Sequence, residues 1–150
     1  MVSGSREWRA MCAALWRVAL ACCGDALLAA VVVEGAVTAA ARRCGRRAAG
    51  DVWRELCVAL RRVPPSDLCA GATELAAVLR GLPLPQRLAV ALVDVGGLDV
   101  SRAAAASGVS WWELRRQRLA GLAVLAKDGK ASPSPAAAEA DRQPLLAGIG

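Results

Sequence analysis

Histidine, tyrosine and phenylalanine are all absent from this chain, and five tryptophans are its only aromatic residues. Without histidine, Ser-His-Asp and Cys-His catalytic arrangements and mixed Cys/His metal sites are excluded, because each of them needs an imidazole. The shortage of aromatic residues also disfavours β-sandwiches and barrels, whose strands are rich in Tyr and Phe. We therefore expect a protein that is not an enzyme, with no catalytic residues, metal, cofactor or small-molecule substrate.

The cysteines form no CxxC pair, so their spacing disfavours a metal or redox site. A secreted disulfide framework needs a signal peptide, and the early apolar stretch is interrupted by Arg9 and Arg17 without a clear cleavage site. We expect reduced thiols packed in the core of a cytoplasmic protein, although the adjacent Cys22 and Cys23 leave a redox switch open. The six residues are Cys12, Cys22, Cys23, Cys44, Cys57 and Cys69.

Long hydrophobic runs are also missing. Within the apolar stretch 18–41, the longest unbroken apolar run is 26–33, whereas a membrane span needs roughly 18 to 20 residues. We expect no membrane partner.

Ala, Val and Leu are abundant, and 56% of the residues are hydrophobic. The chain has 19 Lys and Arg against 13 Asp and Glu, which gives a net charge of +6. This composition favours helices, and 150 residues suit one ordinary domain or two very small ones.

Apolar residues recur at three- and four-residue steps through the first half of the chain, which is typical of helices with one buried face. Gly24 and Asp25 supply a stop and an N-cap between the first two helices, and Asp51 supplies a cap for the third. The second helix is apolar nearly all round, so we expect it to be buried on several sides or covered by a partner. The predicted helices are 7–22, 26–43 and 51–62.

Pro64, Pro65 and Ser66 interrupt the helical pattern and mark a linker over 63–71. Beyond it, Asp99 predicts a cap for the helix 100–107, Gly108 a tight turn and Ser110 a cap for the last helix, so the last two helices have the sequence form of a helix-turn-helix. The fold expected is all-α, with two small helical domains, 1–62 and 72–127, joined by the Pro-containing linker, and a disordered tail at 128–150. The helices predicted in the second domain are 73–79, 86–95, 100–107 and 111–127.

The second half resembles region four of bacterial RNA polymerase sigma factors of the extracytoplasmic-function group. The resemblance is carried by residues 79–125, LRGLPLPQRLAVALVDVGGLDVSRAAAASGVSWWELRRQRLAGLAVL. The matching positions are Leu82, Pro83, Gln86, Arg87, Gly97, Leu98, Ala103, Ala104, Gly108, Val109, Ser110 and Leu114.

The first half is similar to region two of the same family. Residues 15–43, LWRVALACCGDALLAAVVVEGAVTAAARR, follow its pattern of an aromatic-containing helix that ends in Gly-Asp before a second helix. Trp53 and Leu56 stand where the family has its promoter-melting helix. The resemblance covers about residues 7–126 in the family's order, which makes the combination more specific than either motif.

This resemblance implies a non-catalytic protein that directs transcription initiation. The first domain would engage core RNA polymerase through Asp25 and Glu34, the second would dock its last helix on promoter DNA, and an anti-sigma protein is a further candidate partner. Arginines can meet phosphates and guanine edges in the major groove, and Ser110 lies at a helix N-terminus that suits a phosphate. The expected DNA-binding residues are Arg61, Arg62, Ser110, Trp111, Trp112, Arg115, Arg116 and Arg118.

The chain also departs from the family pattern. Ala30 and Val31 occupy positions that are usually acidic, Val33 replaces a Gln, and only Glu34 remains of the clamp-binding set. Trp111 and Trp112 replace a small or polar pair in the last helix, where one Trp filling the core is the simpler interpretation. The arginines equally suit a solvated, solubilising surface. Two alternatives therefore stay open: a degenerate sigma-like protein acting as a stand-alone DNA-binding regulator, and a protein-interaction module that uses its apolar second helix.

Overall fold

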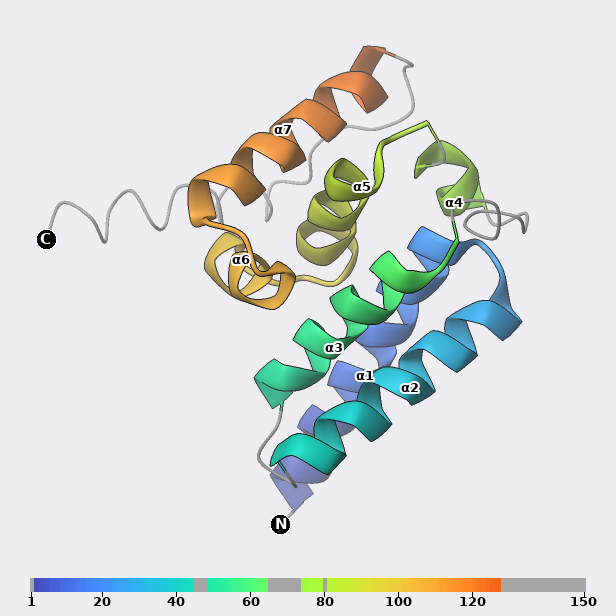
Figure 1. Ribbon diagram of the computed structural model, residues 1–150, viewed down its shortest axis with the longest axis vertical. Helices are drawn as coiled ribbons and strands as arrows, with labels where there is room; N and C mark the ends of the chain where they lie inside the picture. Colours follow the sequence, from blue (N-terminus) through green and yellow to red (C-terminus); the bar gives the residue numbers. More distant parts are fainter. Residues whose placement is uncertain (1, 45–48, 65–73, 80, 128–150) are drawn as a thin grey trace, which may run out of the picture.

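The computed structural model describes residues 2–44, 49–64, 74–79 and 81–127, and all of its regular structure in these ranges is helical. The expected all-α class is therefore confirmed for this part of the chain (Figure 1). The elements are α1 (Val2–Cys23), α2 (Ala26–Cys44), α3 (Ala49–Arg62), α4 (Glu74–Leu79), α5 (Leu84–Val90), the π-helical turn η2 (Ala91–Val95), α6 (Val100–Ser107) and α7 (Trp111–Lys127).

The α1–α2 junction has the predicted stop and cap. Gly24 has a φ of 77° and donates its N–H to the carbonyl of Leu20 at 2.8 Å, a helix end that favours glycine. The Asp25 carboxylate then accepts from the N–H of Leu27 at 3.2 Å. The two helices therefore turn back on each other within two residues, and α1 packs against α2.

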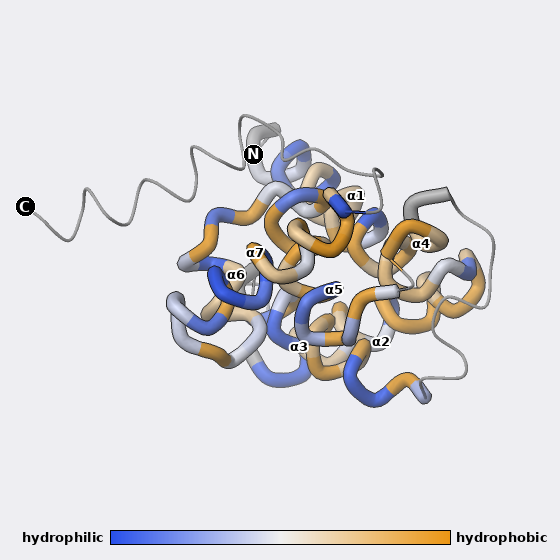
Figure 2. The backbone as a smooth tube through the Cα atoms, turned by 90° about the horizontal axis from the view of Figure 1, so that it is seen from above, coloured by the Kyte–Doolittle hydropathy of each residue, from blue (hydrophilic) through white to orange (hydrophobic). Residues whose placement is uncertain are grey.

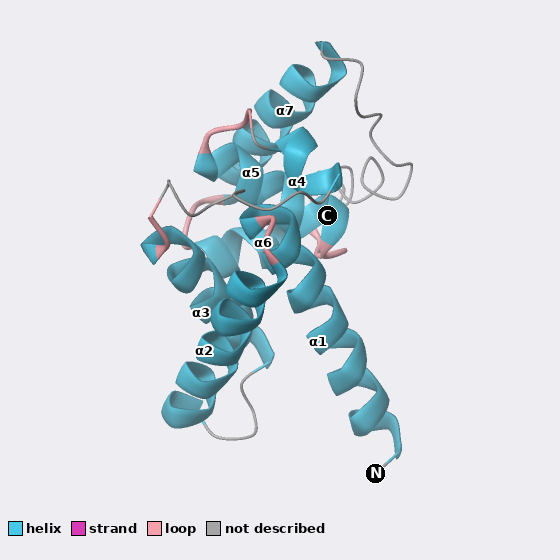
Figure 3. Ribbon diagram, turned by 90° about the vertical axis from the view of Figure 1, so that its right-hand side faces the viewer, coloured by secondary structure: helices cyan, strands magenta, loops and turns pink. Residues whose placement is uncertain are grey.

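Helix α1 begins at Val2, earlier than the predicted start at residue 7. Residues 4–10 are exposed, and Figure 3 shows this end of α1 extending away from α2 and α3. The apolar periodicity used for the prediction begins only where α1 meets its neighbours, so it could not mark a solvated first turn.

Helix α3 is amphipathic and lies between α2 and α6, packing against both. Its buried apolar residues recur at three- and four-residue steps, as a helix with one core face requires. They are Val52, Trp53, Leu56, Cys57 and Leu60. Because α3 begins at Ala49, Asp51 lies in its first turn rather than at the predicted cap position, where a carboxylate still suits the helix dipole.

The two halves of the chain share one hydrophobic core. Leu15 and Val18 of α1 and Leu56 of α3 belong to the same buried cluster as Leu92 of η2 and Leu114 of α7. The two predicted domains thus pack directly against each other (Figure 1). Of the predicted linker, only Val63 and Pro64 are described. The rest of 63–71 and the predicted tail at 128–150 lie outside the described residues.

The helix predicted over 86–95 is two elements. Helix α5 begins at Leu84, with a proline in its first turn, and gives way to η2, which ends where Gly96 donates to the carbonyl of Ala91 at 2.8 Å. Gly97 then turns the chain with a φ of 74°. The extra residue in the π-helical turn shifts the side chains that follow it, which periodicity alone does not reveal.

The structure shows how deeply most of the cysteines are buried and how hydrophobic the described helices are. Cys22, Cys23 and Cys57 are buried and Cys12 is half-buried, while the side chain of Cys44 and all of Cys69 lie outside the described residues. Hydrophobic segments alternate with hydrophilic ones along the backbone in Figure 2, and α4 is largely hydrophobic. None of the described helices combines the length and apolar composition that a membrane crossing requires.

Candidate nucleic-acid interface

Three residues determine where α6 begins and how a short turn joins it to α7. The Asp99 carboxylate caps α6 by accepting from the N–H of Arg102 at 2.7 Å. Gly108 ends α6 with a φ of 74°, and the Ser110 hydroxyl caps α7 by accepting from the N–H of Glu113 at 3.1 Å. The predicted caps at Asp99 and Ser110 and the predicted Gly108 turn are confirmed, and Gly108 and Ser110 set the direction in which α7 leaves the turn.

Helix α7 presents two different faces. Its inner face carries Leu114, Arg118, Gly121 and Leu125, all buried, and it packs against α5. The first turns of its outer face expose Ser110, Trp112 and Arg116. A ligand that approaches α7 from solvent therefore meets an indole and a guanidinium next to a helix N-terminus.

Arg118 does not belong to this outer face. Its side chain is 1% exposed, and it is paired with Asp94 of η2 through Nε–Oδ2 and Nη2–Oδ1 distances of 2.9 and 3.0 Å. This overturns Arg118 as an expected DNA contact, because a buried side chain cannot reach a phosphate from inside the protein. The sequence contained a signal, since Arg118 lies four residues after Leu114 and seven before Leu125, on the apolar row of the helix.

Arg116 is exposed but already paired. Its Nε and Nη2 atoms contact both carboxylate oxygens of Glu113 at 2.7–3.1 Å, and Gln117 donates to the same carboxylate at 2.7 Å. The hydrogen bonds from Arg116 and Gln117 hold the pKa of Glu113 below its usual value, and the carboxylate raises that of Arg116. Exposed ion pairs are weak, so a phosphate can compete with Glu113 for this guanidinium.

Trp111, Trp112 and Arg115 form a cluster at the start of α7. The two indoles meet edge to face with centroids 4.6 Å apart, and the Arg115 guanidinium lies 5.6 Å from the Trp111 ring centroid. Trp111 is partly buried against the core, whereas Trp112 is 64% exposed. One Trp thus fills the core and its neighbour faces solvent. Buried nitrogens of both Trp111 and Arg115, Nε1 and Nε, have no partner within the described residues.

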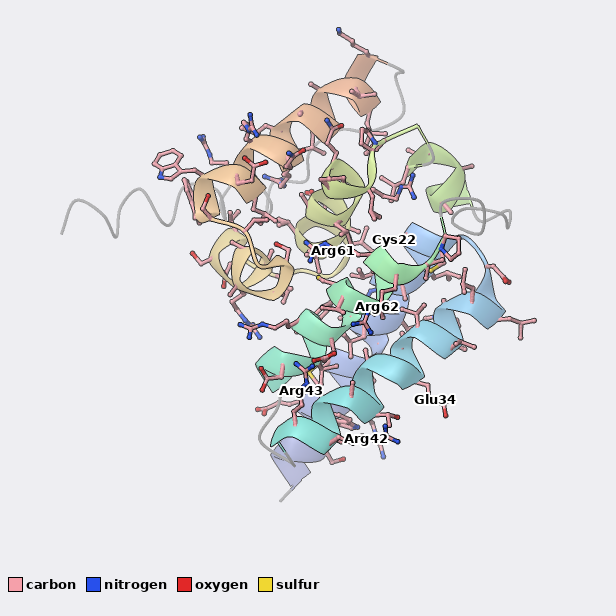
Figure 4. The ribbon with its side chains drawn as sticks, viewed as in Figure 1. Cys22, Glu34, Arg42, Arg43, Arg61 and Arg62 are labelled. Carbon is pink, nitrogen blue, oxygen red and sulfur yellow. The ribbon has the colours of Figure 1, made fainter. Side chains whose placement is uncertain are left out.

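Arg61 and Arg62 point to different sides of α3, so the structure does not gather them into one site with α7. Arg61 reaches α6, where its Nη2 donates to the carbonyl of Ser107 at 2.6 Å, just before the turn. Arg62 lines the α2 side of α3, and Figure 4 labels both residues. Residues that are adjacent in a helix are about 100° apart around its axis, so only Arg61 lies near the α6–α7 turn.

The two expected polymerase-binding residues lie on α2 and its cap. The Asp25 carboxylate caps α2, and Glu34 is exposed further along the same helix (Figure 4). They are nine residues apart and do not form one cluster. Around them the surface of α2 is apolar, with Leu27 and Val31 both strongly exposed.

Two structural arginines and their partners were missed by the sequence prediction. Asp94 holds Arg118, and Arg87 is buried with its Nε and Nη2 donating to the carbonyls of Leu79 and Leu82 at 3.2 and 2.9 Å. Arg87 thereby links α5 to the end of α4 and to the residues just before α5. Buried arginines are rare unless paired, and neither residue type nor spacing identified Arg87.

An open groove of about 460 Å³ runs beside the first turns of α7, with an apolar floor from α5. Its polar rim is Arg61, Ser107, Glu113 and Gln117, and all four side chains are already hydrogen-bonded within the protein. Across the described part of the chain, no group of His, Cys, Asp or Glu side chains is arranged to hold a metal. Comparison of the chain with protein-family models, curated proteins and solved structures found no match.

Proposed function

We propose that this protein is a sigma-factor-like DNA-binding protein that directs or modulates transcription initiation through promoter DNA and core RNA polymerase. The DNA-binding part of the proposal is supported by one observation: Trp112, Arg115 and Arg116 lie on the first two turns of α7, directly after the Gly108 turn and the Ser110 cap. A helix that follows such a turn is the element that enters a major groove in helix-turn-helix proteins.

The chemistry of this face suits a polyanion. The free amides at the start of α7 and the two arginines favour phosphates, and the exposed Trp112 indole offers an apolar surface for base edges or thymine methyl groups. The net charge of +6 adds a general attraction to nucleic acid. Arg61 supports the turn by holding the Ser107 carbonyl, so it acts on the α6–α7 geometry rather than as an independent contact.

The role of the first half in this proposal is to bind core polymerase, with Glu34 and Asp25 as its contacts and an anti-sigma protein as a competitor. The alternative is a stand-alone DNA-binding regulator, favoured by a specific observation. The outer face of α2 carries the exposed apolar residues Leu27 and Val31, and Val31 occupies one of the positions that are acidic in the family it resembles.

The first test is binding of the full chain to a labelled pool of random-sequence duplexes, measured over a range of salt concentrations. Replacing Arg115 and Arg116 by Ala should weaken binding and lower the slope of log affinity against log salt by about one unit per lost phosphate contact. Arg6→Ala with Arg9→Ala is the matched control, because it removes the same charge from exposed positions on α1. Equal losses for both double variants would contradict a DNA-binding role for α7.

A second measurement separates the two transcription roles. Tagged chain is mixed with purified bacterial core RNA polymerase, and the stoichiometry of the complex is determined by size-exclusion chromatography. A one-to-one complex that Glu34→Lys weakens supports the sigma-factor role. DNA binding without a polymerase complex supports the stand-alone regulator, and the absence of both would overturn the proposal.

A further inference from the structure

The outer face of α2 is an apolar surface that no described part of the chain covers. Leu27 is 79% exposed and Val31 67% exposed, although most large apolar side chains among the described residues are buried or half-buried. Beside them, an open groove of about 400 Å³ runs between α2 and α3. Val31, Gly35 and Ala39 line it from α2, and Val58 and Ala59 line it from α3. Exposed apolar surface of this kind is typical of protein contacts.

Leu27, Val31, Gly35 and Ala39 follow one another at four-residue steps, so they form a single ridge along α2. The first two side chains are large and exposed, and the last two positions are small. A helix that packs here can place large side chains over Gly35 and Ala39, while its own small positions receive Leu27 and Val31.

Gly35 has no role in the packing of the chain itself. It lies in the interior of α2, where glycine is less favourable than alanine, yet a Cβ at this position would meet no atom within 4 Å. Alanine would therefore fit the isolated chain and strengthen the helix. The small residue becomes useful only when another surface approaches α2 closely.

We propose that this face binds α2 of a second copy of the chain in an antiparallel, two-fold arrangement. The ridge is self-complementary about Val33: Leu27 and Ala39 are each six residues from it, and Val31 and Gly35 are each two residues from it. A two-fold contact joins residue i to residue j and residue j to residue i. In this register Val31 of each copy lies over Gly35 of the other, and Leu27 lies over Ala39.

The charges at the ends of α2 match the same register. Arg42 is exposed near the C-terminal end and has no ion-pair partner among the described residues, whereas Arg43 is held by Glu55 at 3.0 Å. Asp25 caps the N-terminal end of α2. Antiparallel pairing about Val33 brings Arg42 of each copy beside Asp25 of the other. The Asp25 carboxylate attracts the guanidinium, whereas the positive helix N-terminus beside it opposes this attraction.

Glu34 gives a further consequence of this register. It is exposed one residue from the two-fold axis, on the flank of the ridge, so the Glu34 side chains of the two copies approach each other. Solvent screens this repulsion, and Glu34→Gln should tighten the dimer.

The test is sedimentation velocity of the full chain at up to about 100 µM, where a dimer with a dissociation constant of about 10 µM is mostly associated. The wild type should sediment as a dimer that dissociates on dilution. Val31→Glu should be monomeric, because it places two carboxylates in the apolar contact. Val124→Glu is the matched control: Val124 is 38% exposed on α7, and this variant should keep the dimer.

Gly35→Ala separates self-association from a general effect on folding. It should raise the melting temperature of the diluted monomer, because alanine strengthens α2, and weaken the dimer about tenfold, because the methyl group fills the position opposite Val31. A wild type that stays monomeric at the highest concentration overturns the proposal and leaves the face to a different partner. A dimer that Val31→Glu leaves intact overturns it as well.

Discussion

Arg118 of α7, which is buried, and Asp94 of η2, which is partly exposed, form an ion pair through two parallel hydrogen bonds, with Nε–Oδ2 and Nη2–Oδ1 distances of 2.9 and 3.0 Å. The pair joins the inner face of α7 to the π-helical turn, and the Arg118 side chain is 1% exposed. Both bonds hold α7 in an orientation in which Trp112 and Arg116 face solvent.

Asp94→Ala should lower the free energy of unfolding by about 3 kcal/mol, because it leaves the Arg118 guanidinium buried without its carboxylate. Replacing both residues, with Arg118→Met and Asp94→Ala, should recover most of this loss, since no buried charge remains. Urea denaturation followed by circular dichroism measures both values. A single variant as stable as the wild type would mean that solvent reaches the guanidinium.

Stability should fall as the pH rises from about 9 to about 11, because of Cys57. Burial raises the pKa of this thiol from 9.0 to about 11, against a smaller lowering by Arg61. Over this range the unfolded thiol loses its proton while the folded one keeps it, so the unfolded state binds fewer protons and the free energy of unfolding decreases. The full effect is about 2 to 3 kcal/mol. Thermal melts at several pH values should show this slope, and Cys57→Ala should remove it.

Glu113→Gln should increase the affinity for duplex DNA about twofold to fivefold at low salt, because an exposed ion pair contributes about 0 to 1 kcal/mol and its loss frees Arg116. The salt slope should steepen in the same variant, since one more cation meets phosphate. Fluorescence anisotropy with the random-sequence duplex pool measures both changes. Glu7→Gln on α1 is the control for the change in net charge, and an equal gain there would assign the effect to net charge alone.

Gly96→Ala should destabilise the junction between the two halves by about 1 to 3 kcal/mol, because the added methyl group overpacks a full site. A Cβ on Gly96 would lie 2.8 Å from both the Leu92 carbonyl oxygen and Val18 Cγ2, and 3.4 Å from the Trp53 ring. Gly81→Ala is a matched control, since a Cβ there meets nothing within 4 Å. Chemical denaturation compares the two, and similar stabilities would show that α1 and α3 yield at this contact.

Local chemistry accounts for the parts of the fold that the sequence predicted well. Helix α6 was predicted with its observed bounds, and the caps by Asp99 and Ser110 and the turns at Gly24 and Gly108 are as expected. These features depend on residues only a few positions apart, so composition and spacing suffice to identify them. The start of α1 was missed because its first turns have no apolar partner and hence no periodic pattern.

The helical class, the order of the described helices and the caps at Asp25, Asp99 and Ser110 can be predicted from the sequence, because they depend on backbone preferences and on neighbours within a few residues. Only the packing of the helices places Arg118 against Asp94, separates Arg61 from Arg62 and builds the core that the two halves share. Each of these features depends on which faces of the helices meet. The π-helical turn between α5 and α6 shifts the side chains that follow it by one residue, and the spacing of the apolar residues does not reveal this shift.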